Sequence, residues 1–188
     1  CFKNYWCRGL CVDDSIVTEN SWDSLHEFKK SLRWKSPQDS EFIDRNGFGL
    51  LAYASTSDCV VVVQESLTMI SSISDEKTRT SSLESRVPKG GIVGLGIPGG
   101  ATALIGAMIA SRSEIVSLLL EHGADPVATD VTGNDPLMFA SIFGRPDNVK
   151  FWLKKFPDWD LERRNTVVGG VALGHAVFMG PHRQELVK

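Results

Sequence analysis

Apolar residues recur in a fixed pattern along the second half of the chain. The stretch Thr102-Ala-Leu-Ile-Gly-Ala-Met aligns with Asp135-Pro-Leu-Met-Phe-Ala-Ser, and both have Leu at the third place and Ala at the sixth. Downstream, Glu114-Ile-Val-Ser-Leu-Leu-Leu aligns with Asp147-Asn-Val-Lys-Phe-Trp-Leu at the same separation of 33 residues (135 − 102 and 147 − 114). A period of this length is typical of repeat proteins, in which each unit stacks on its neighbours. The pattern predicts a repeat architecture for this part of the chain.

Two further copies flank this pair. Val171-Ala-Leu-Gly-His-Ala-Val begins 36 residues after Asp135 (171 − 135) and is followed by Gln184-Glu-Leu-Val-Lys. A fainter copy, Gly49-Leu-Leu-Ala-Tyr-Ala-Ser, is followed by the apolar residues 60–67. We therefore expect about four repeats, of which the first is divergent and the last incomplete.

The residue types at the predicted helix ends agree with this division. Asp135 and Pro136 suit the N-cap and first position of a helix over 135–143. Gly123 follows the apolar helix 114–121 and suits a left-handed helix end. Pro157 takes that place in the next repeat, so we expect an irregular turn there. Trp152 and Trp159 are expected in the core.

The repeat resembles the ankyrin repeat, whose pattern is G-x-T-P-L-H-x-A-A, then I-V-x-L-L-L, then G-A-D. The matches in the copy at 100–130 are Thr102, Leu104, Ala107, Ile115, Val116, residues 118–120 and Gly123-Ala124-Asp125. It departs from the pattern at Ala103 and Ile105, and the next copy has Asp135 in place of Thr. Residues 130–133 and 44–47 fit the D-x-x-G turn that opens a repeat. The resemblance covers residues 44–188 and implies an all-α, ankyrin-like helical solenoid of stacked helix-turn-helix repeats with short turns.

An amphipathic helix is predicted ahead of the repeats. Trp22, Leu25, Phe28 and Leu32 fall on one helical face. We expect this region, 21–43, to cap the open end of the stack, and residues 1–20 to form an arm. The divergent repeat then covers 44–72, and the remaining repeats cover 99–188.

An insertion separates the first repeat from the second. Residues 71–91 are rich in Ser and Thr, charged, and end in Pro and Gly, a composition typical of a loop or a disordered segment. We therefore expect an insertion loop over 73–98. Arg79 precedes Ser82 at a spacing that suits a basophilic kinase, and Ser36-Pro37 suits a proline-directed one.

The stretch 90–110, GGIVGLGIPGGATALIGAMIA, contains no charged residue and has three interpretations. Residues 94–99 have the G-x-G-x-x-G spacing of a dinucleotide-binding loop, but the strand and acidic residue that such a loop requires are not in place. The stretch has the length of a membrane-spanning helix, yet it holds seven glycines and Pro98. Since residues 102–110 have a matched copy at 135–143, we expect a seam between the insertion and a repeat helix.

Composition and candidate chemistry add little to this interpretation. The chain has 188 residues, 42% of them hydrophobic and 23% charged, with a net charge of −3. Its basic residues are scattered, which argues against nucleic-acid binding. The cysteines and histidines lack the spacing of a metal site or a catalytic triad. We therefore expect no catalytic residue, no cofactor and no metal, and structural roles for His122 and His175.

The resemblance implies a binding surface made by the turn tips and the exposed side of the first helices. Carried over position by position, the candidate residues are Arg45, Asn46, Phe48, Val131, Thr132, Asn134, Ile142, Phe143, Phe178 and Met179. Packing of Phe143 and Phe178 within the stack remains the alternative for these two aromatic residues.

The function that the resemblance implies is non-catalytic protein–protein interaction, with a protein partner and with membrane contact only through a complex. The alternative is a regulatory or assembly segment of a larger enzyme or membrane complex, since the chain begins with Cys1 and ends within a predicted helix. We expect an intracellular, cytoplasmic location, and an organellar one stays open.

Overall fold

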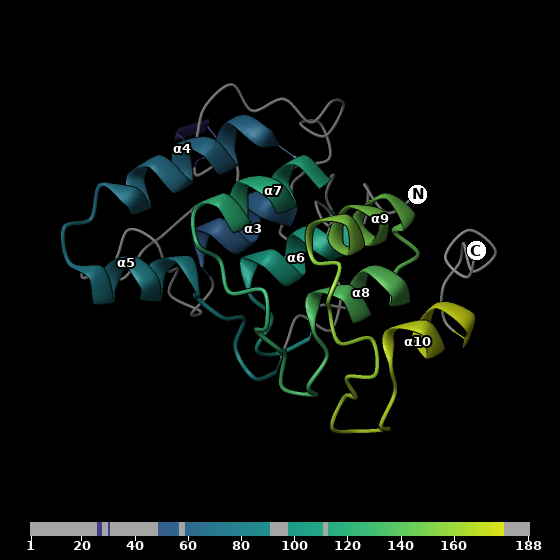
Figure 1. The fold of residues 1–188 in the computed structure, drawn as a ribbon. Coiled ribbons are helices and arrows are strands. Elements are labelled where there is room, and N and C mark those ends of the chain that lie inside the picture. Colours follow the sequence, from purple (N-terminus) through teal and green to yellow (C-terminus); the bar gives the residue numbers. More distant parts are fainter. Residues whose placement is uncertain are drawn as a thin grey trace.

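The computed structural model describes residues 26–27, 30, 49–56, 59–90, 98–110 and 113–178, and every regular element named within these ranges is an α-helix (Figure 1). These helices are α3 (Leu50–Thr56), α4 (Val60–Ser71), α5 (Glu76–Leu83), α6 (Ala103–Ala110), α7 (Ser113–Glu121), α8 (Pro136–Ile142), α9 (Pro146–Lys155) and α10 (Ala172–Phe178).

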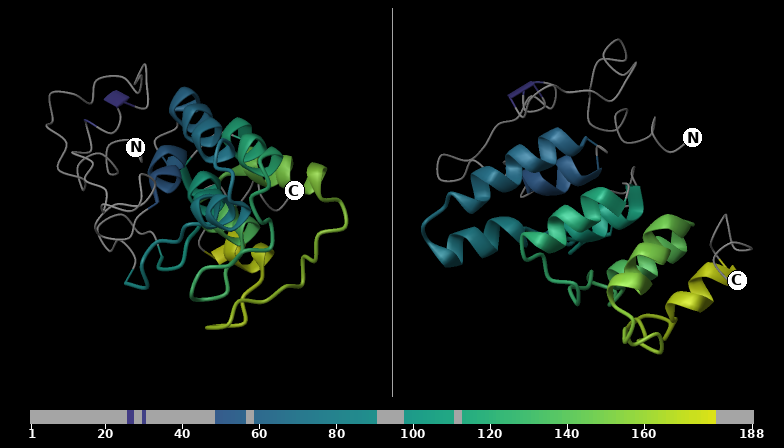
Figure 2. Two further views of the ribbon diagram at one scale, coloured as in Figure 1. Left: turned by 90° about the vertical axis from the view of Figure 1, so that its left-hand side faces the viewer. Right: turned by 45° about the horizontal axis from the view of Figure 1, so that its top comes forward.

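The helices stack in two rows. The first helices of successive repeats, α3, α6, α8 and α10, pack side by side, and the second helices, α4, α7 and α9, form a parallel row (Figures 1 and 2). Each of α3, α6 and α8 also packs against the second helix of its own repeat. The predicted all-α solenoid of stacked helix pairs is therefore confirmed.

Local signals fix several helix ends as predicted. The Asp135 carboxylate accepts a hydrogen bond from the backbone N–H of Met138 at 2.8 Å, and Pro136 occupies the first turn of α8. Gly123 ends α7 with a φ of 89°, in the left-handed region that favours glycine. Helix α9 ends at Lys155, two residues before Pro157.

The core lies between the two rows of helices. Its fully buried side chains come from every complete repeat and include Leu50, Leu104, Met108, Ile115 and Trp152. The Trp152 ring packs against Phe156, with ring centroids 4.8 Å apart, and meets the edge of Trp159 at 5.1 Å. This aromatic cluster fills the turn after α9; Trp152 is buried in the core as the sequence predicts, and Trp159 is half-buried against it.

The interpretation of residues 73–98 as a loop is wrong for its first half, which contains helix α5. The Asp75 carboxylate caps this helix by accepting a hydrogen bond from the Thr78 backbone N–H at 2.7 Å. Leu83, at its last turn, is buried against the core. Ser82, the predicted kinase target, is also buried, so its hydroxyl is not presented to a kinase in this fold.

Two charged residues after α5 fasten the insertion to the repeats that follow. The Glu84 carboxylate accepts a hydrogen bond from the Asp125 backbone N–H at 2.8 Å. The Arg86 guanidinium donates to the carbonyl oxygens of Gly100 at 3.0 Å and Thr129 at 2.6 Å. Burial raises the pKa of the Glu84 carboxyl above its ordinary value, and the hydrogen bond from Asp125 opposes that shift.

Two further expectations fall mostly outside the described residues. Of the predicted capping region, 21–43, the structure describes only His26, Glu27 and Lys30, which are helical. The stretch 90–110 is described except for 91–97, and it contains the expected repeat helix, α6, which begins at Ala103. Within the described part of the chain, every helix is too short or too polar to cross a membrane.

The packing of the core predicts that truncating two neighbouring residues of α9 lowers the free energy of unfolding by very different amounts. Trp152 is fully buried, whereas Leu153 is 38% exposed. We expect Trp152→Ala to lower the free energy of unfolding by about 3–5 kcal/mol because it leaves a cavity among Phe156 and Trp159. Leu153→Ala, the matched control, should cost about 1 kcal/mol or less. Urea denaturation followed by circular dichroism measures both, and equal losses would contradict the assignment of Trp152 to the core.

Candidate protein-binding surface

Three connecting turns, residues 98–101, 130–134 and 165–170, precede the first helices α6, α8 and α10 and lie side by side. The Val131 backbone N–H donates to the Gly99 carbonyl at 3.0 Å. The Thr166 backbone N–H donates to the Thr132 carbonyl at 2.9 Å, and the Thr166 hydroxyl donates to the same oxygen. These bonds join the three turns into one continuous edge at the N-terminal ends of the first helices, which we call the edge of connecting turns.

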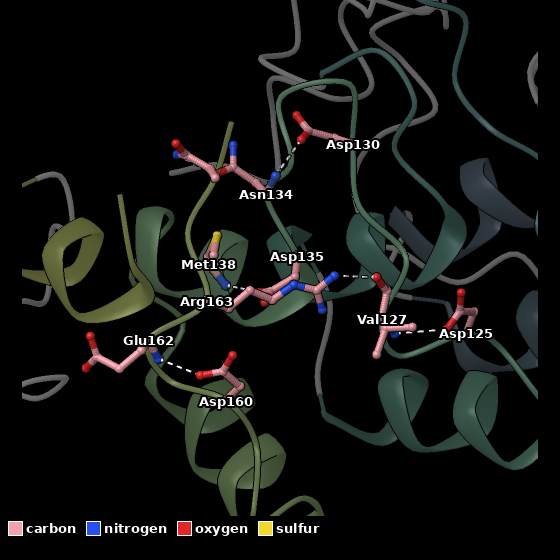
Figure 3. Close-up of polar contacts among 10 residues, drawn as sticks. Asp125, Val127, Asp130, Asn134, Asp135, Met138, Asp160, Glu162 and Arg163 are labelled. Carbon is pink, nitrogen blue, oxygen red and sulfur yellow. Dashed lines mark hydrogen bonds and ion pairs between the residues drawn. The ribbon is translucent and has the colours of Figure 1, made fainter. Parts of the chain in front are cut away.

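The middle turn is organised by one carboxylate. Asp130 accepts a hydrogen bond from the backbone N–H of Thr132 at 2.9 Å. It also accepts one from the backbone N–H of Asn134 at 2.8 Å (Figure 3). Gly133 has a φ of 77°, and a Cβ at this position would lie 2.9 Å from the Thr166 side chain. The D-x-x-G turn predicted at 130–133 is therefore confirmed, and its glycine is required both by φ and by the next turn.

The last turn has the same design with different residues. The Asn165 side-chain oxygen accepts from the backbone N–H groups of Val168 at 3.0 Å and Gly170 at 3.3 Å, so it replaces Asp130 in a turn that is one residue longer. Gly169 adopts the same left-handed φ as Gly133. Sequence reasoning missed this turn and its exposed tip, Val167 and Val168, because it lacks the D-x-x-G pattern. The signal was Gly169, which lies 36 residues (169 − 133) after Gly133.

A chain of polar side chains links the last two turns to α10. The Asn165 amide group donates to the Asn134 side-chain oxygen at 2.9 Å and lies 3.2 Å from Nε2 of His175. Burial lowers the pKa of His175, and the nearby Asp135 carboxylate partly opposes this shift. In this arrangement Nε2 of neutral His175 accepts a hydrogen bond from Asn165. The expected structural role of His175 agrees with this geometry.

A second polar link joins the N-terminus of α8 to the turn after α7. The Nε of Arg163 lies 3.9 Å from the buried Asp135 carboxylate, and its Nη2 donates to the Val127 carbonyl at 3.1 Å (Figure 3). Burial raises the pKa of Asp135 above its ordinary value, while the hydrogen bond from Met138 and the charge of Arg163 oppose the shift. Arg163 therefore offsets part of the cost of burying this carboxylate.

The structure separates the candidate binding residues into three groups. Val131 is 54% exposed and Phe178 is 89% exposed. Thr132 and Asn134 are half-buried and hold the turns together through their side chains. Ile142 and Phe143 are half-buried against a second apolar cluster made of Val87, Ala101, Ile105, Ile109 and Phe139. The packing alternative therefore applies to Phe143, whose ring centroid lies 6.4 Å from that of Phe139, and it does not apply to Phe178. Arg45, Asn46, Phe48 and Met179 lie outside the described residues.

Among the described residues, His, Cys, Asp and Glu side chains form no cluster that would hold a metal ion. The Nδ1 of His122 lies 2.8 Å from the Leu118 carbonyl of its own helix, in agreement with a structural role. Most of the glycine motif at 94–99 falls outside the described part of the chain.

Comparison with known proteins identifies a matching family and a relative. Residues 85–164 match the model of a family described as ankyrin repeats, three copies. The chain is also 50% identical over 46 residues to the 2-5A-dependent ribonuclease of Homo sapiens. That match covers 24% of this chain, and the chain spans only 6% of the length of that ribonuclease.

The environment of His175 predicts an acid-sensitive end of the stack. Its folded-state pKa is depressed, so the stability that it contributes is present above its unfolded pKa of about 6.5 and is lost as the pH falls through the lower folded value. His175→Gln keeps a hydrogen-bond acceptor that does not titrate. We expect this variant to lose less unfolding free energy than the parent chain between about pH 7.5 and pH 5. Urea titrations at both pH values measure the difference, and identical losses would rule out the role given to His175.

The cap of α8 allows a second prediction. Asp135→Ala removes the acceptor of the Met138 N–H and should cost about 0.5–2 kcal/mol of unfolding free energy. Asp135→Asn keeps an acceptor oxygen at the same place and should cost less. Thermal denaturation at neutral pH compares the two variants. If Asn were as damaging as Ala, the carboxylate would act through Arg163 and not as a helix cap.

Proposed function

Because residues 85–164 belong to the ankyrin-repeat family, we propose that this chain is a non-catalytic protein–protein interaction module. Ankyrin repeats are generally protein–protein interaction modules. The observation that supports this function best is the continuous edge of connecting turns, which are hydrogen-bonded to each other and present exposed apolar tips. A surface fixed in this way loses little conformational freedom when it binds.

The proposed binding surface runs along the turn tips and the adjoining side of the first helices. Val131 is its exposed residue in the turn before α8, and Ile142 and Phe143 are half-buried at the other end of that helix. Thr132 and Asn134 support the tips through the network that also holds Asn165. Residues of this kind, apolar or aromatic within a polar rim, are frequent anchors in protein interfaces. The partner is a protein, and no catalytic residue or cofactor enters this proposal.

A second candidate function is that the repeats regulate or assemble a larger enzyme or membrane complex. The match to a segment of a ribonuclease favours this alternative, because the matched residues form a small part of that enzyme. The two proposals differ in what the partner does. A partner set dominated by subunits of one enzyme, whose activity changes when this chain is added, would support the second proposal over a general interaction module.

Val131 gives the proposal a sharp test with a matched control. Val131→Asp places a charge at the centre of the turn edge, and Val127→Asp places one at an equally exposed valine (53%) in the turn after α7. Affinity purification from cells, with the captured proteins identified by mass spectrometry, should recover partners with the parent chain and with Val127→Asp. Val131→Asp should reduce that recovery at least about tenfold, as expected when a charge enters an apolar anchor site.

Circular dichroism would verify that both variants keep the parent helix content. Equal recovery by the two variants would place the binding surface elsewhere. Recovery that depends on Val127 and not on Val131 would move it to the turns after the second helices.

A further inference from the structure

The end of the insertion adds a fourth segment to the edge of connecting turns. The Val87 backbone N–H donates to the Ala101 carbonyl at 2.9 Å, and the Gly100 backbone N–H donates to the Val87 carbonyl at 2.7 Å. The Val87 side chain is buried in the second apolar cluster. Residues 86–89 are therefore fixed beside the turn at 98–101.

This segment brings two cations to the edge. Arg86 and Lys89 are both exposed, and the Lys89 backbone lies against Gly99. The Arg86 guanidinium is held by the carbonyls of Gly100 and Thr129 through one nitrogen, Nη1. Within the described part of the chain, its Nε and Nη2 groups donate to no other atom, so they are available to a ligand. A guanidinium fixed in this way loses little freedom when it binds a carboxylate.

The exposed side chain of Val131 lies next to the same glycine as this guanidinium. A Cβ at Gly100 would lie 3.0 Å from Cγ1 of Val131, and the Gly100 carbonyl accepts the hydrogen bond from Arg86. An apolar side chain and an oriented cation therefore flank one residue. Two or three residues of an extended peptide, at about 3.3 Å each, are long enough to contact both.

The last turn contains a similar combination. The Nη1 of Arg164 donates to the Gly169 carbonyl at 3.0 Å, and Val167 and Val168 are exposed at the tip of the same turn. Helices packed side by side lie about 8–10 Å apart, a distance that about three residues of an extended chain cover. One peptide lying along the edge would therefore reach both combinations.

The charges along this surface decide which kind of partner fits. Its exposed cations are Arg86, Lys89 and Arg164, although the whole chain has a net charge of −3. The neighbouring carboxylates are already engaged, because Glu84 accepts a backbone N–H from the turn after α7 and Asp130 accepts those of its own turn. Among the described residues, none of the three cations forms an ion pair. A ligand that carries carboxylates would complement this surface.

Nucleic acid fits the same surface less well. Sites for nucleic acid neutralise many phosphates with clustered Lys and Arg. Here the cations alternate with exposed valines, which gain free energy on binding only when an apolar group covers them. A protein segment offers carboxylates and apolar side chains in alternation, and a phosphate backbone does not.

We propose that the edge of connecting turns, together with residues 86–89, binds an extended acidic segment of a partner protein. One carboxylate of that segment pairs with Arg86, and an apolar side chain within the next two or three residues contacts Val131. The guanidinium fixes the position of the segment, because it binds a carboxylate through two parallel hydrogen bonds. This inference rests on the proposed function and adds to it the chemical class of the partner.

A random dodecapeptide library displayed on phage and selected on the full chain tests this inference. The selected peptides should be enriched in Asp or Glu that lie within about three residues of Val, Leu, Ile or Phe. The most enriched sequence is then synthesised, and its dissociation constant is measured by fluorescence anisotropy. Rising salt concentration should weaken its binding, because salt screens exposed charges.

Arg86→Glu should raise the dissociation constant of that peptide at least about tenfold, because two carboxylates would then face each other. A peptide whose acidic residue is replaced by Lys should bind the Arg86→Glu chain better than it binds the parent chain. Loss of folding cannot produce such an exchange of preference. Arg79→Glu is the matched control, since its guanidinium also donates to a backbone carbonyl, that of Ile73, but lies outside the edge. It should leave the constant unchanged.

Selection of no peptide, or of peptides without acidic enrichment, would overturn the inference. So would a peptide whose binding Arg86→Glu leaves unchanged. A labelled single-stranded DNA oligonucleotide that displaces the peptide and depends on Arg86 would assign these cations to phosphate and would also overturn it. If Val131→Asp lowers the recovery of cellular partners and Arg86→Glu does not, the proposed function stands and this inference fails. If recovery is unaffected by Val131→Asp while the selected peptides still depend on Arg86, the reverse holds.

Discussion

The structure depends on the burial of apolar helix faces between consecutive repeats. No repeat has an interior of its own, because each contributes two helices of about two to three turns, and helices of this length are marginal in water without packing. Leu104 and Ile115 come from the two helices of one repeat and Trp152 from the next repeat, yet they belong to one buried cluster. The stability of every element is therefore a property of its neighbours, and this constraint determines where the surface is rigid and where it is open.

The connecting turns convert this packing into the rigid edge that we propose as the binding surface. Each turn is closed internally by one side chain, Asp130 in the middle turn and Asn165 in the last, and is joined to the next turn by a backbone hydrogen bond. The exposed tips are thus held by side chains and backbone groups whose hydrogen bonds are already made within the protein. This explains why Thr132 and Asn134 support the surface more than they extend it, and why the exposed valines dominate its outer side.

Repeats, helix caps and the core could be predicted from sequence because their causes are local or periodic. Asp135 with Pro136, Gly123 and Trp152 each report their role through residue type and position in the repeat. Helix α5 could not be predicted in this way, since its Ser- and Thr-rich composition indicates a loop, and the contacts of Arg86 join residues 14 and 43 positions apart in sequence. For the candidate site, Val131 was placed correctly at an exposed tip. The packing of Phe143 depends on Ile105 and Phe139 from two different helices, and periodicity alone does not reveal it.

The contacts of Glu84 and Arg86 also affect how force would pass through the molecule. In a simple solenoid, units detach one at a time from an end, because each is held only by its nearest neighbour. Here Arg86 donates hydrogen bonds to the carbonyls of Gly100 and Thr129, and Glu84 accepts one from the Asp125 amide. Gly100 precedes helix α6, and Asp125 and Thr129 follow helix α7. Tension applied to the chain ahead of Glu84 would therefore load a complete repeat from both of its ends at once. The residues after α5 therefore tie the chain ahead of them to both ends of the repeat formed by α6 and α7.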